Sequence, residues 1–168
     1  MKEIYFAGGC FWGMERVFRQ LDGVTETTVG YANGTTENPT YQEVCTDTTG
    51  HRETVKVVYD PEVLPLETLL KAYFLCIDPT LQNRQGHDIG TQYQTGIYTA
   101  DEESLAAVTA YAAEEKKKYD VFFTEIGPLK CFWPAEEYHQ KYLEKNPAGY
   151  CHITNREFEL VRQLNREE

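Results

Sequence analysis

The sequence has no long apolar run and is short of positive charge. Its 168 residues include 16 lysines and arginines against 27 aspartates and glutamates, so the formal net charge is -11. This charge argues against nucleic acid or an anionic membrane as a partner. No apolar run approaches the roughly 20 residues that a transmembrane helix needs, and Met1-Lys2-Glu3 leads straight into a predicted strand, without the pattern of a signal peptide. We therefore expect a cytoplasmic protein that binds neither nucleic acid nor a membrane.

The cysteines and histidines lack the spacing of a metal site. The five cysteines, at positions 10, 45, 76, 131 and 151, contain no C-x-x-C pair, and the four histidines contain no H-x-x-x-H pair. An odd number of cysteines in a chain of this length also disfavours a disulfide framework. We expect no metal and separate roles for individual thiols, with Cys45, Cys76 and Cys131 packed inertly among apolar neighbours.

The order of the predicted elements indicates an α+β fold. Alternating patterns and turn residues predict strands at 4–7, 24–32, 53–59 and 93–98, and short strands at 122–126 and 129–132 that form a hairpin around Gly127-Pro128. Helical spacing predicts helices at 11–21, 66–77 and 154–164, one from a capping box of Thr99 and Glu102 to about residue 119, and one opening at Pro134. We expect a single domain over residues 1–168, a two-layer sandwich with a mixed β-sheet flanked by helices, and a C-terminal loop and tail from about residue 144.

The residues around Cys10 are the most informative in the chain. The strand predicted at 4–7 runs into Gly8-Gly9, and Cys10 stands where a helix begins. A cysteine in the first turn of a helix faces unpaired N–H groups and the positive end of the helix dipole, which favours the nucleophilic thiolate. Phe11 and Trp12 follow directly and form an apolar wall suited to a thioether group. The alternative is a buried structural cysteine.

Glu53 is the carboxylate most suited to acid catalysis. In the predicted strand, residues 53, 55, 57 and 59 share an apolar face, whereas Arg52, Thr54 and Lys56 form a polar face that we expect to be solvated. Burial on the apolar face would raise the pKa of Glu53, and a carboxyl that stays protonated near neutral pH can act as a general acid. The alternative is that Glu53 lies at the exposed end of the strand.

Four more side chains lie on or beside loops. The hydroxyls of Tyr41 and Tyr93 could donate hydrogen bonds to a substrate oxygen, and Asp88 lies in a polar loop close to Tyr93 in the sequence. Cys151 follows the turn residues Asn146-Pro147-Ala148-Gly149. A thiol on such a loop can travel to meet an oxidised partner.

Motifs along the chain resemble those of the type A peptide methionine sulfoxide reductases. The matching segments are Gly9-Cys10-Phe11-Trp12-Gly13-Met14-Glu15, Gly30-Tyr31-Ala32, Asn38-Pro39-Thr40-Tyr41, Thr49-Gly50-His51 with Glu53, Tyr59-Asp60-Pro61, Asp78-Pro79-Thr80, Asn83-Arg84-Gln85-Gly86, Asp88-Ile89-Gly90 with Gln92-Tyr93, Pro134-Ala135-Glu136-Glu137-Tyr138-His139-Gln140, Lys145-Asn146-Pro147 and Gly149-Tyr150-Cys151. They occur in order from residue 4 to residue 151, and this many motifs in register is a specific signal. The chain departs from the common pattern at Gln94 and Trp133, which leaves the chemistry in place and bears only on substrate preference.

The resemblance implies a substrate and a pocket. The substrate would be methionine-S-sulfoxide, free or in peptides and proteins, as in protein repair after oxidative stress. Phe11 and Trp12 would hold the methyl group, Tyr41 and Tyr93 would assist at the sulfoxide oxygen, and Asp88 would shape the pocket.

The resemblance also implies a redox cycle without a metal or an organic cofactor. Cys10 would attack the sulfoxide sulfur while Glu53 donates a proton to the oxygen, leaving Cys10 as a sulfenic acid. Cys151 would attack that sulfenic acid to form a disulfide, which thioredoxin would reduce by thiol–disulfide exchange. No cysteine follows Cys151, so a single resolving thiol is the simplest expectation.

Two rival functions use the same residues differently. A thiol hydrolase would pair Cys10 with a histidine such as His87 or His139, although no sequence feature links either to Cys10. A non-catalytic module would bind methionine-containing peptides at Phe11 and Trp12, and its binding would survive Cys10→Ala.

Overall fold

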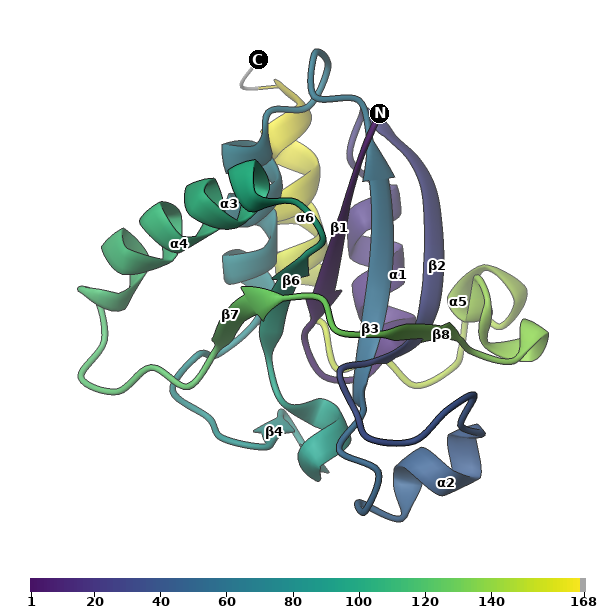
Figure 1. Ribbon diagram of the computed structural model, residues 1–168. Coiled ribbons are helices and arrows are strands. Elements are labelled where there is room, and N and C mark those ends of the chain that lie inside the picture. The colour runs from purple at the N-terminus through teal and green to yellow at the C-terminus, as the bar shows by residue number, and fades with distance from the viewer. Residues whose placement is uncertain (167–168) are drawn as a thin grey trace.

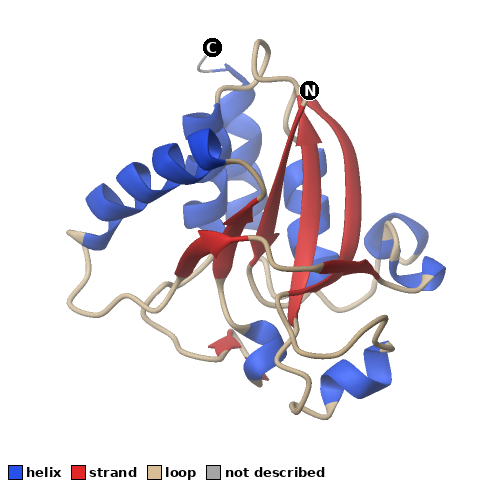
Figure 2. Cartoon of the chain, viewed as in Figure 1, coloured by secondary structure: helices blue, strands red, loops and turns tan. Residues whose placement is uncertain are grey.

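A six-stranded mixed sheet forms the centre of the computed structural model, which describes residues 1–166. In spatial order the strands are β7 (Glu125–Pro128), β6 (Gly96–Thr99), β1 (Lys2–Ala7), β3 (Arg52–Tyr59), β2 (Val24–Ala32) and β8 (Phe132–Pro134). Neighbouring strands are antiparallel except β6 and β7, which are parallel. Figures 1 and 2 show the long strands β1, β2 and β3 side by side.

Three helices cover one face of the long strands. They are α1 (Phe11–Arg19), α3 (Leu66–Cys76) and α6 (Asn155–Gln163), and all three lie behind the sheet in Figure 1. The apolar side chains that recur at helical spacing on α1, including Met14 and Phe18, are fully buried in the core. The expected α+β sandwich of a mixed sheet and helices is therefore confirmed, and so is the terminal helix.

The face of β3 that was expected to be solvated is covered. Thr54 has no exposed surface, and Arg52, Lys56 and Val58 on that face reach solvent only in part. The reason is a second apolar cluster on this side of the sheet, formed by Tyr5, Ala7, Ala32 and Tyr98 with Leu129 and Phe132 packed against it. The chain between β7 and β8 crosses this face in Figure 1.

The predicted hairpin around Gly127-Pro128 is wrong. β7 pairs with β6 at one edge of the sheet, and β8 pairs with β2 at the other edge. Each of the two short strands thus supplies the hydrogen-bonding partner of an otherwise open edge. Local sequence could not reveal this, because both strands pair with segments about 30 or more residues away.

Two further expectations were displaced. The strand expected at 93–98 begins only at Gly96, after the short helix η1 (Thr91–Tyr93). The cap of α4 (Glu102–Lys116) is Asp101, whose side chain accepts a hydrogen bond from the Ser104 N–H at 2.8 Å, and not Thr99. An N-cap needs a side-chain acceptor directly before the first helical turn, and Asp101 is closer to that turn than Thr99.

The helix expected to open at Pro134 is absent. Pro134 ends β8, and the chain continues into η2 (Glu137–His139) and then α5 (Tyr142–Lys145). Gln140 interrupts the helix because its side chain bonds both the N–H and the C=O of Val29, each at 2.9 Å. Lys141 then adopts a left-handed backbone with φ of 53°.

Short elements gather at the end of the sheet where β1 leads into α1. They are α2 (Tyr41–Cys45), β4 (Arg84–Gln85), β5 (Asp88–Ile89) and η1, and they lie below the long strands in Figure 1. Most of the residues singled out from the sequence lie on these elements or on the adjacent ends of β3 and α1. Within residues 1–166, no helix is both long and apolar enough to cross a membrane.

Candidate active site

Cys10 caps the N-terminus of α1 and is held there by a sharp turn. It precedes Phe11, the first helical residue, and only 6% of its surface is exposed. Gly9 has a φ of 88°, and a Cβ at this position would lie 2.8 Å from the Gln85 Cβ. Glycine is therefore required before the thiol for both its backbone conformation and its small size.

The pKa of the Cys10 thiol is shifted upward, opposite to the direction expected from its position at a helix start. Burial and the nearby carboxyl of Glu53 raise the pKa of Cys10 well above its ordinary value, and the backbone N–H of Trp12 lowers it to a smaller extent. Because the sulfur is withdrawn from water, desolvation outweighs the favourable end of the helix. The helix start still presents an N–H group to any negative charge that develops on the sulfur.

Glu53 lies at the start of β3 and faces α1, as expected from strand periodicity. Only 1% of its surface is exposed, and its Oε1 accepts a hydrogen bond from the Phe11 N–H at 3.2 Å. Burial raises the pKa of Glu53 to about 8, the Phe11 N–H opposes this rise, and the charge of Asp88 adds to it. The Oε2 atom is buried without a partner among the described residues. The geometry thus leaves a protonated carboxyl beside the thiol, with one oxygen free for a ligand.

Tyr41 and Tyr93 approach Glu53 from two different segments. Tyr41 opens α2, whose start is fixed by a capping box between Thr40 and Glu43. Tyr93 ends η1. Burial, followed by the charge of Glu53, raises the pKa of both hydroxyls, so both remain protonated donors.

Asp88 completes the polar side of the site from β5. Its charge raises the pKa of Cys10, Glu53 and Tyr93, so it lies within electrostatic reach of all three. Its Oδ2 accepts a hydrogen bond from the Tyr150 hydroxyl at 2.9 Å. This bond attaches the C-terminal loop to the same side of the site.

Aromatic rings pack together around the first residues of α1. Phe11 is buried, and its ring centroid lies 5.8 Å from that of Tyr31. Trp12 is half-buried and stacks on Tyr142 with a centroid distance of 3.9 Å and an interplanar angle of 10°. The indole N–H of Trp12 donates a hydrogen bond to His139 Nδ1 at 3.0 Å.

Cys151 reaches the first turns of α1 from the loop between α5 and α6. A Cβ at Gly13 would lie 3.0 Å from the Cys151 Sγ, so the absence of a side chain there lets the loop approach the helix. Cys151 is half-buried, its charged form raises the pKa of Cys10, and its Sγ lies 3.5 Å from the carbonyl oxygen of Ile153. Both thiols are free in this state.

The three remaining cysteines differ in their exposure to solvent. Cys76 is buried, as expected, and Cys131 is half-buried. Cys45 is exposed on α2 and lies close enough to Tyr41 to share a side-chain hydrogen bond, so its interpretation as a packed core residue is wrong. Its apolar sequence neighbour Val44 is buried instead, because on a helix adjacent residues face different directions.

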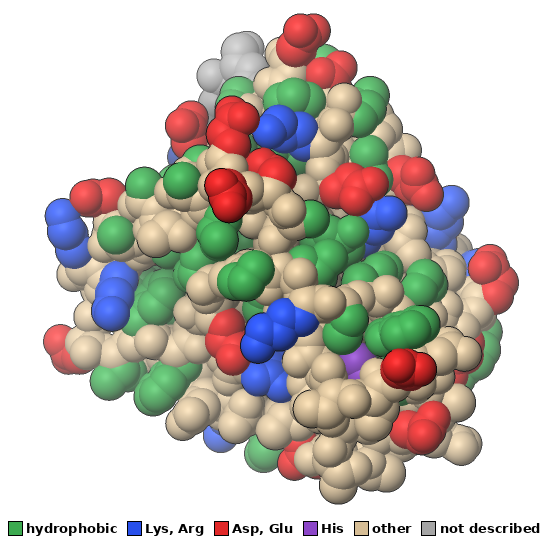
Figure 3. Space-filling view, viewed as in Figure 1, with side chains coloured by type: hydrophobic (Ala, Val, Ile, Leu, Met, Phe, Trp, Pro, Cys, Tyr) green, Lys and Arg blue, Asp and Glu red, His purple; other side chains and the backbone are tan. Residues whose placement is uncertain are grey.

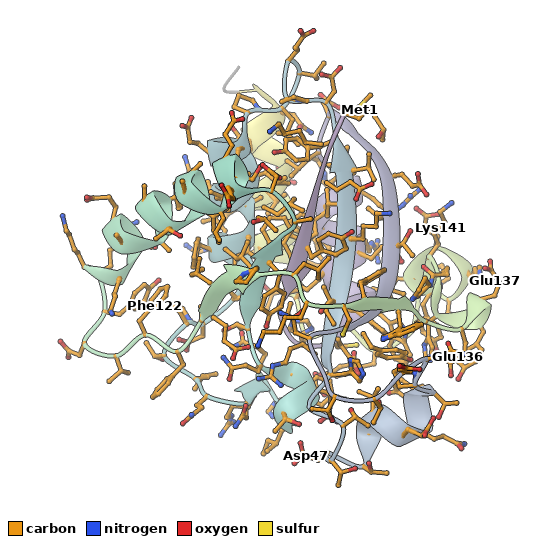
Figure 4. All side chains as sticks on the ribbon, in the orientation of Figure 1. Met1, Asp47, Phe122, Glu136, Glu137 and Lys141 are labelled. Carbon is orange, nitrogen blue, oxygen red and sulfur yellow. The ribbon has the colours of Figure 1, made fainter. Side chains whose placement is uncertain are left out.

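Glu136, Tyr142 and Tyr150 were missed as site residues, and His139 was considered only as the base of a thiol hydrolase. Glu136 accepts hydrogen bonds from the Tyr31 hydroxyl at 2.9 Å and the Tyr41 N–H at 3.0 Å. Figure 4 shows Glu136 on the side of the molecule where α2 and α5 lie. All but Tyr142 stand in segments quoted for the family resemblance, which was the only available signal. Within residues 1–166, no three histidine, cysteine or acidic side chains are grouped as metal ligands.

The site combines a buried thiol at a helix start with a neutral carboxyl, an aromatic wall and a second nearby thiol. These groups define a thiol-dependent enzyme. The model of the family Peptide methionine sulfoxide reductase matches residues 2–167. A similar protein, peptide methionine sulfoxide reductase MsrA of Clostridium acetobutylicum, is 60% identical over 154 residues, which are 91% of this chain and 95% of that protein.

Solved structures show the same likeness. Reduced Mxr1 from Saccharomyces cerevisiae has a TM-score of 0.86 and 38% identity, with 91% of each chain covered. Mxr1 in complex with Trx2 has a TM-score of 0.60 and 26% identity, with 84% of each chain covered. The chain therefore belongs to the peptide methionine sulfoxide reductase family.

Proposed function

We propose that Cys10, Glu53 and Cys151 carry out the thiol-dependent reduction of methionine sulfoxide that defines this family, and that the S epimer is the substrate, free or in peptides and proteins. The observation that carries this proposal is the buried carboxyl of Glu53, with a pKa raised to about 8 and an unpartnered oxygen, next to the Cys10 thiol. A neutral acid beside a nucleophile can protonate a sulfoxide oxygen while the sulfur is attacked.

In the first step Cys10 attacks the sulfoxide sulfur. The sulfoxide oxygen accepts a proton from Glu53, with the hydroxyls of Tyr41 and Tyr93 as further donors. The products are methionine and the sulfenic acid of Cys10, so the oxygen atom passes from the substrate to the enzyme and the carboxyl of Glu53 recovers its proton from the thiol. Protonation of the oxygen makes the sulfur more electrophilic, which compensates for the protonated resting state of the thiol.

The apolar wall selects the group that enters. Phe11 and the Trp12 ring offer a surface for the methyl group, and aromatic faces contact sulfur favourably. Asp88 shapes the polar side of the pocket, close to Tyr93 and Glu53.

In the second step the Cys151 thiol attacks the sulfenic sulfur of Cys10, which forms a disulfide and releases water. The position of Cys151 against Gly13, one turn from Cys10, supports this role. The solved complex of Mxr1 with Trx2 supports a thioredoxin as the reductant of that disulfide. We also propose one catalytic domain over residues 1–168 and a cytoplasmic location, where a reducing environment suits five free thiols.

A single turnover without reductant tests the reaction and both thiols. Fully reduced protein is mixed with a peptide containing either the S or the R epimer of methionine sulfoxide, and methionine, free thiols and disulfides are measured. We expect one equivalent of methionine from the S epimer only, the loss of two thiols and a Cys10–Cys151 link by mass spectrometry. Cys10→Ser should yield no methionine, and methionine formed by this variant would remove Cys10 from the reaction.

The hydrolase alternative finds little support in the site. Within residues 1–166, no histidine forms a hydrogen bond with the Cys10 sulfur, and the histidine at the wall uses its Nδ1 for Trp12. An intact set of five thiols after the single turnover, with no methionine from either epimer, would return both the hydrolase and the peptide-binding module to consideration.

A further inference from the structure

We propose that His139 is a positioning residue, which acts through Trp12 and sets the orientation of the indole ring in the wall of the pocket. The inference rests on the proposed function, since the orientation of Trp12 matters for catalysis only if this wall receives the substrate methyl group. His139 belongs to η2, far from Trp12 in the sequence, and 1% of its surface is exposed.

The hydrogen bond between the two rings defines the tautomer of His139. An indole nitrogen can only donate, so the Nδ1 atom that faces it at 3.0 Å must accept. A neutral imidazole that accepts through Nδ1 carries its proton on Nε2. Burial lowers the pKa of His139, which keeps the ring in the neutral, accepting form.

His139 supplies a restraint on Trp12 that stacking alone does not. Tyr142 stacks on the indole at 3.9 Å and 10°, which fixes the plane of the ring. Parallel rings can still slide and turn within that plane. A directional hydrogen bond to the indole N–H removes this freedom, because it specifies where one edge of the ring must lie.

The imidazole is itself held firmly and joins two walls of the site. Its centroid lies 5.3 Å from the ring of Phe11 on α1, 4.5 Å from Tyr41 on α2 and 4.2 Å from Tyr138. The backbone N–H of His139 donates a hydrogen bond to the backbone carbonyl of Glu136 at 2.9 Å. The side chain of Glu136 is in turn bound to the start of α2. His139 is thus a fixed point from which Trp12 can be oriented.

Packing alone does not account for a histidine at this position. Its Nε2 is buried without a partner among the described residues. An unpaired buried donor opposes folding, and an apolar side chain would fill the space without that penalty. The accepting Nδ1 atom is what only a polar side chain provides here.

Asparagine and leucine at position 139 form a matched pair, since they have nearly the same shape but only asparagine offers an acceptor where Nδ1 lies. The parent carries Trp133→Phe, which leaves Trp12 as the only tryptophan. We expect His139→Leu to raise KM for an S-sulfoxide peptide about tenfold with kcat within about threefold, as befits the loss of one hydrogen bond. His139→Asn should keep KM within about threefold of the parent.

Trp12 fluorescence reports the orientation without reference to catalysis. The emission of Trp12 should shift to the red and acrylamide should quench it more strongly in His139→Leu, but not in His139→Asn. If His139→Leu fails to give a folded thermal transition by circular dichroism, His139→Phe serves as a second variant without an acceptor. Equal behaviour of the accepting and non-accepting variants, in KM and in quenching, would overturn the proposal.

A double-mutant cycle with Trp12→Phe separates a role through Trp12 from a direct one. In the Trp12→Phe background, His139→Leu should change KM by less than about twofold, because the hydrogen bond is already gone. A full tenfold effect in that background would show that His139 acts elsewhere. A parent that releases no methionine from the S epimer would instead refute the proposed function, while the quenching comparison would still decide the position of Trp12.

Discussion

At the scale of single residues, burial acts on Cys10 and Glu53 in the same direction but with different chemical effects. Withdrawal from water raises the pKa of both groups. For Glu53 this preserves the proton that an acid needs, whereas for Cys10 it holds back the nucleophilic form. Both effects require that Glu53 stays protonated, because an ionised Glu53 would further disfavour the thiolate of Cys10.

The pH dependence of the reaction should therefore follow Glu53. As pH rises through about 8, the value to which the pKa of Glu53 is raised, kcat/KM should fall, since the acid loses its proton and its charge opposes thiolate formation. Glu53→Gln should lower kcat/KM roughly a hundredfold or more and abolish this descending limb. Stopped-flow measurement of methionine release from pH 6 to about 10 checks both points. A limb that persists unchanged in Glu53→Gln would assign it to another group.

At the scale of elements, α1 is the part on which the site converges. Its start carries the thiol, its first backbone N–H binds Glu53, and its glycine at position 13 admits the loop of Cys151. The segment from β8 to α5 contributes from the opposite side, with Glu136 bound to α2 and Lys141 N–H bound to Glu15 at 2.7 Å. Figure 4 shows Lys141 close to α5.

Gly13→Ala should separate the two chemical steps. The added Cβ would lie 3.0 Å from the Cys151 Sγ and 3.1 Å from the Ile153 Cγ1, so the loop must retreat from the helix. We expect disulfide formation to slow at least about fivefold, while methionine release in the first turnover changes little. Rapid quench with mass analysis of thiols measures both rates. An unaltered rate of disulfide formation would show that the loop is not confined by this contact.

Cys151→Ser should stop the cycle after the first step. The variant should release one equivalent of methionine and then stall with thioredoxin, because the sulfenic acid has no resolving thiol, although a small thiol can still reduce it directly. Cys45→Ser is the matched control, since Cys45 is exposed near Tyr41 but is assigned no step. If Cys151→Ser turned over normally with thioredoxin, Cys151 would not be the resolving residue.

At the scale of the whole molecule, the sheet brings distant segments to one end. β1, β3 and the short elements beyond them meet where α1 begins. On the face drawn in Figure 3, acidic and basic side chains are scattered rather than gathered in one patch.

Global stability should decrease as pH rises because of Glu53. Its pKa in the folded chain, about 8, exceeds the value of about 4.3 for an unfolded glutamate, so the folded state binds more protons between these values. The free energy of unfolding should fall across this window by an amount on the order of a few kcal/mol. Glu53→Gln should show a smaller fall and be the more stable protein at pH 8. Urea titrations of both proteins at pH 5 and pH 8 measure the free energy of unfolding. An equal decrease between the two pH values in both proteins would contradict the assignment.

The sequence by itself determined the main elements and most of the site. The helical spacing after Cys10, the alternation that turns Glu53 inward and the order of motifs are local properties, and they were sufficient for β1 to β3, α1, α3 and α6. They failed for β7 and β8, because each pairs with a strand that is far away in the sequence. They also failed at Gln140, where a side-chain contact to β2 interrupts the expected helix. They also missed the exposure of Cys45, which depends on which side of α2 faces the protein.

Only the tertiary structure decided the protonation of the site and the roles of its supporting residues. The pKa of Cys10 depends on how much water the fold removes and on the carboxyl it brings close, and neither can be read from neighbours in the chain. The bond between Trp12 and His139 joins residues more than a hundred positions apart. Sequence patterns record which face of an element is apolar, whereas desolvation and hydrogen bonding arise only when separate elements meet.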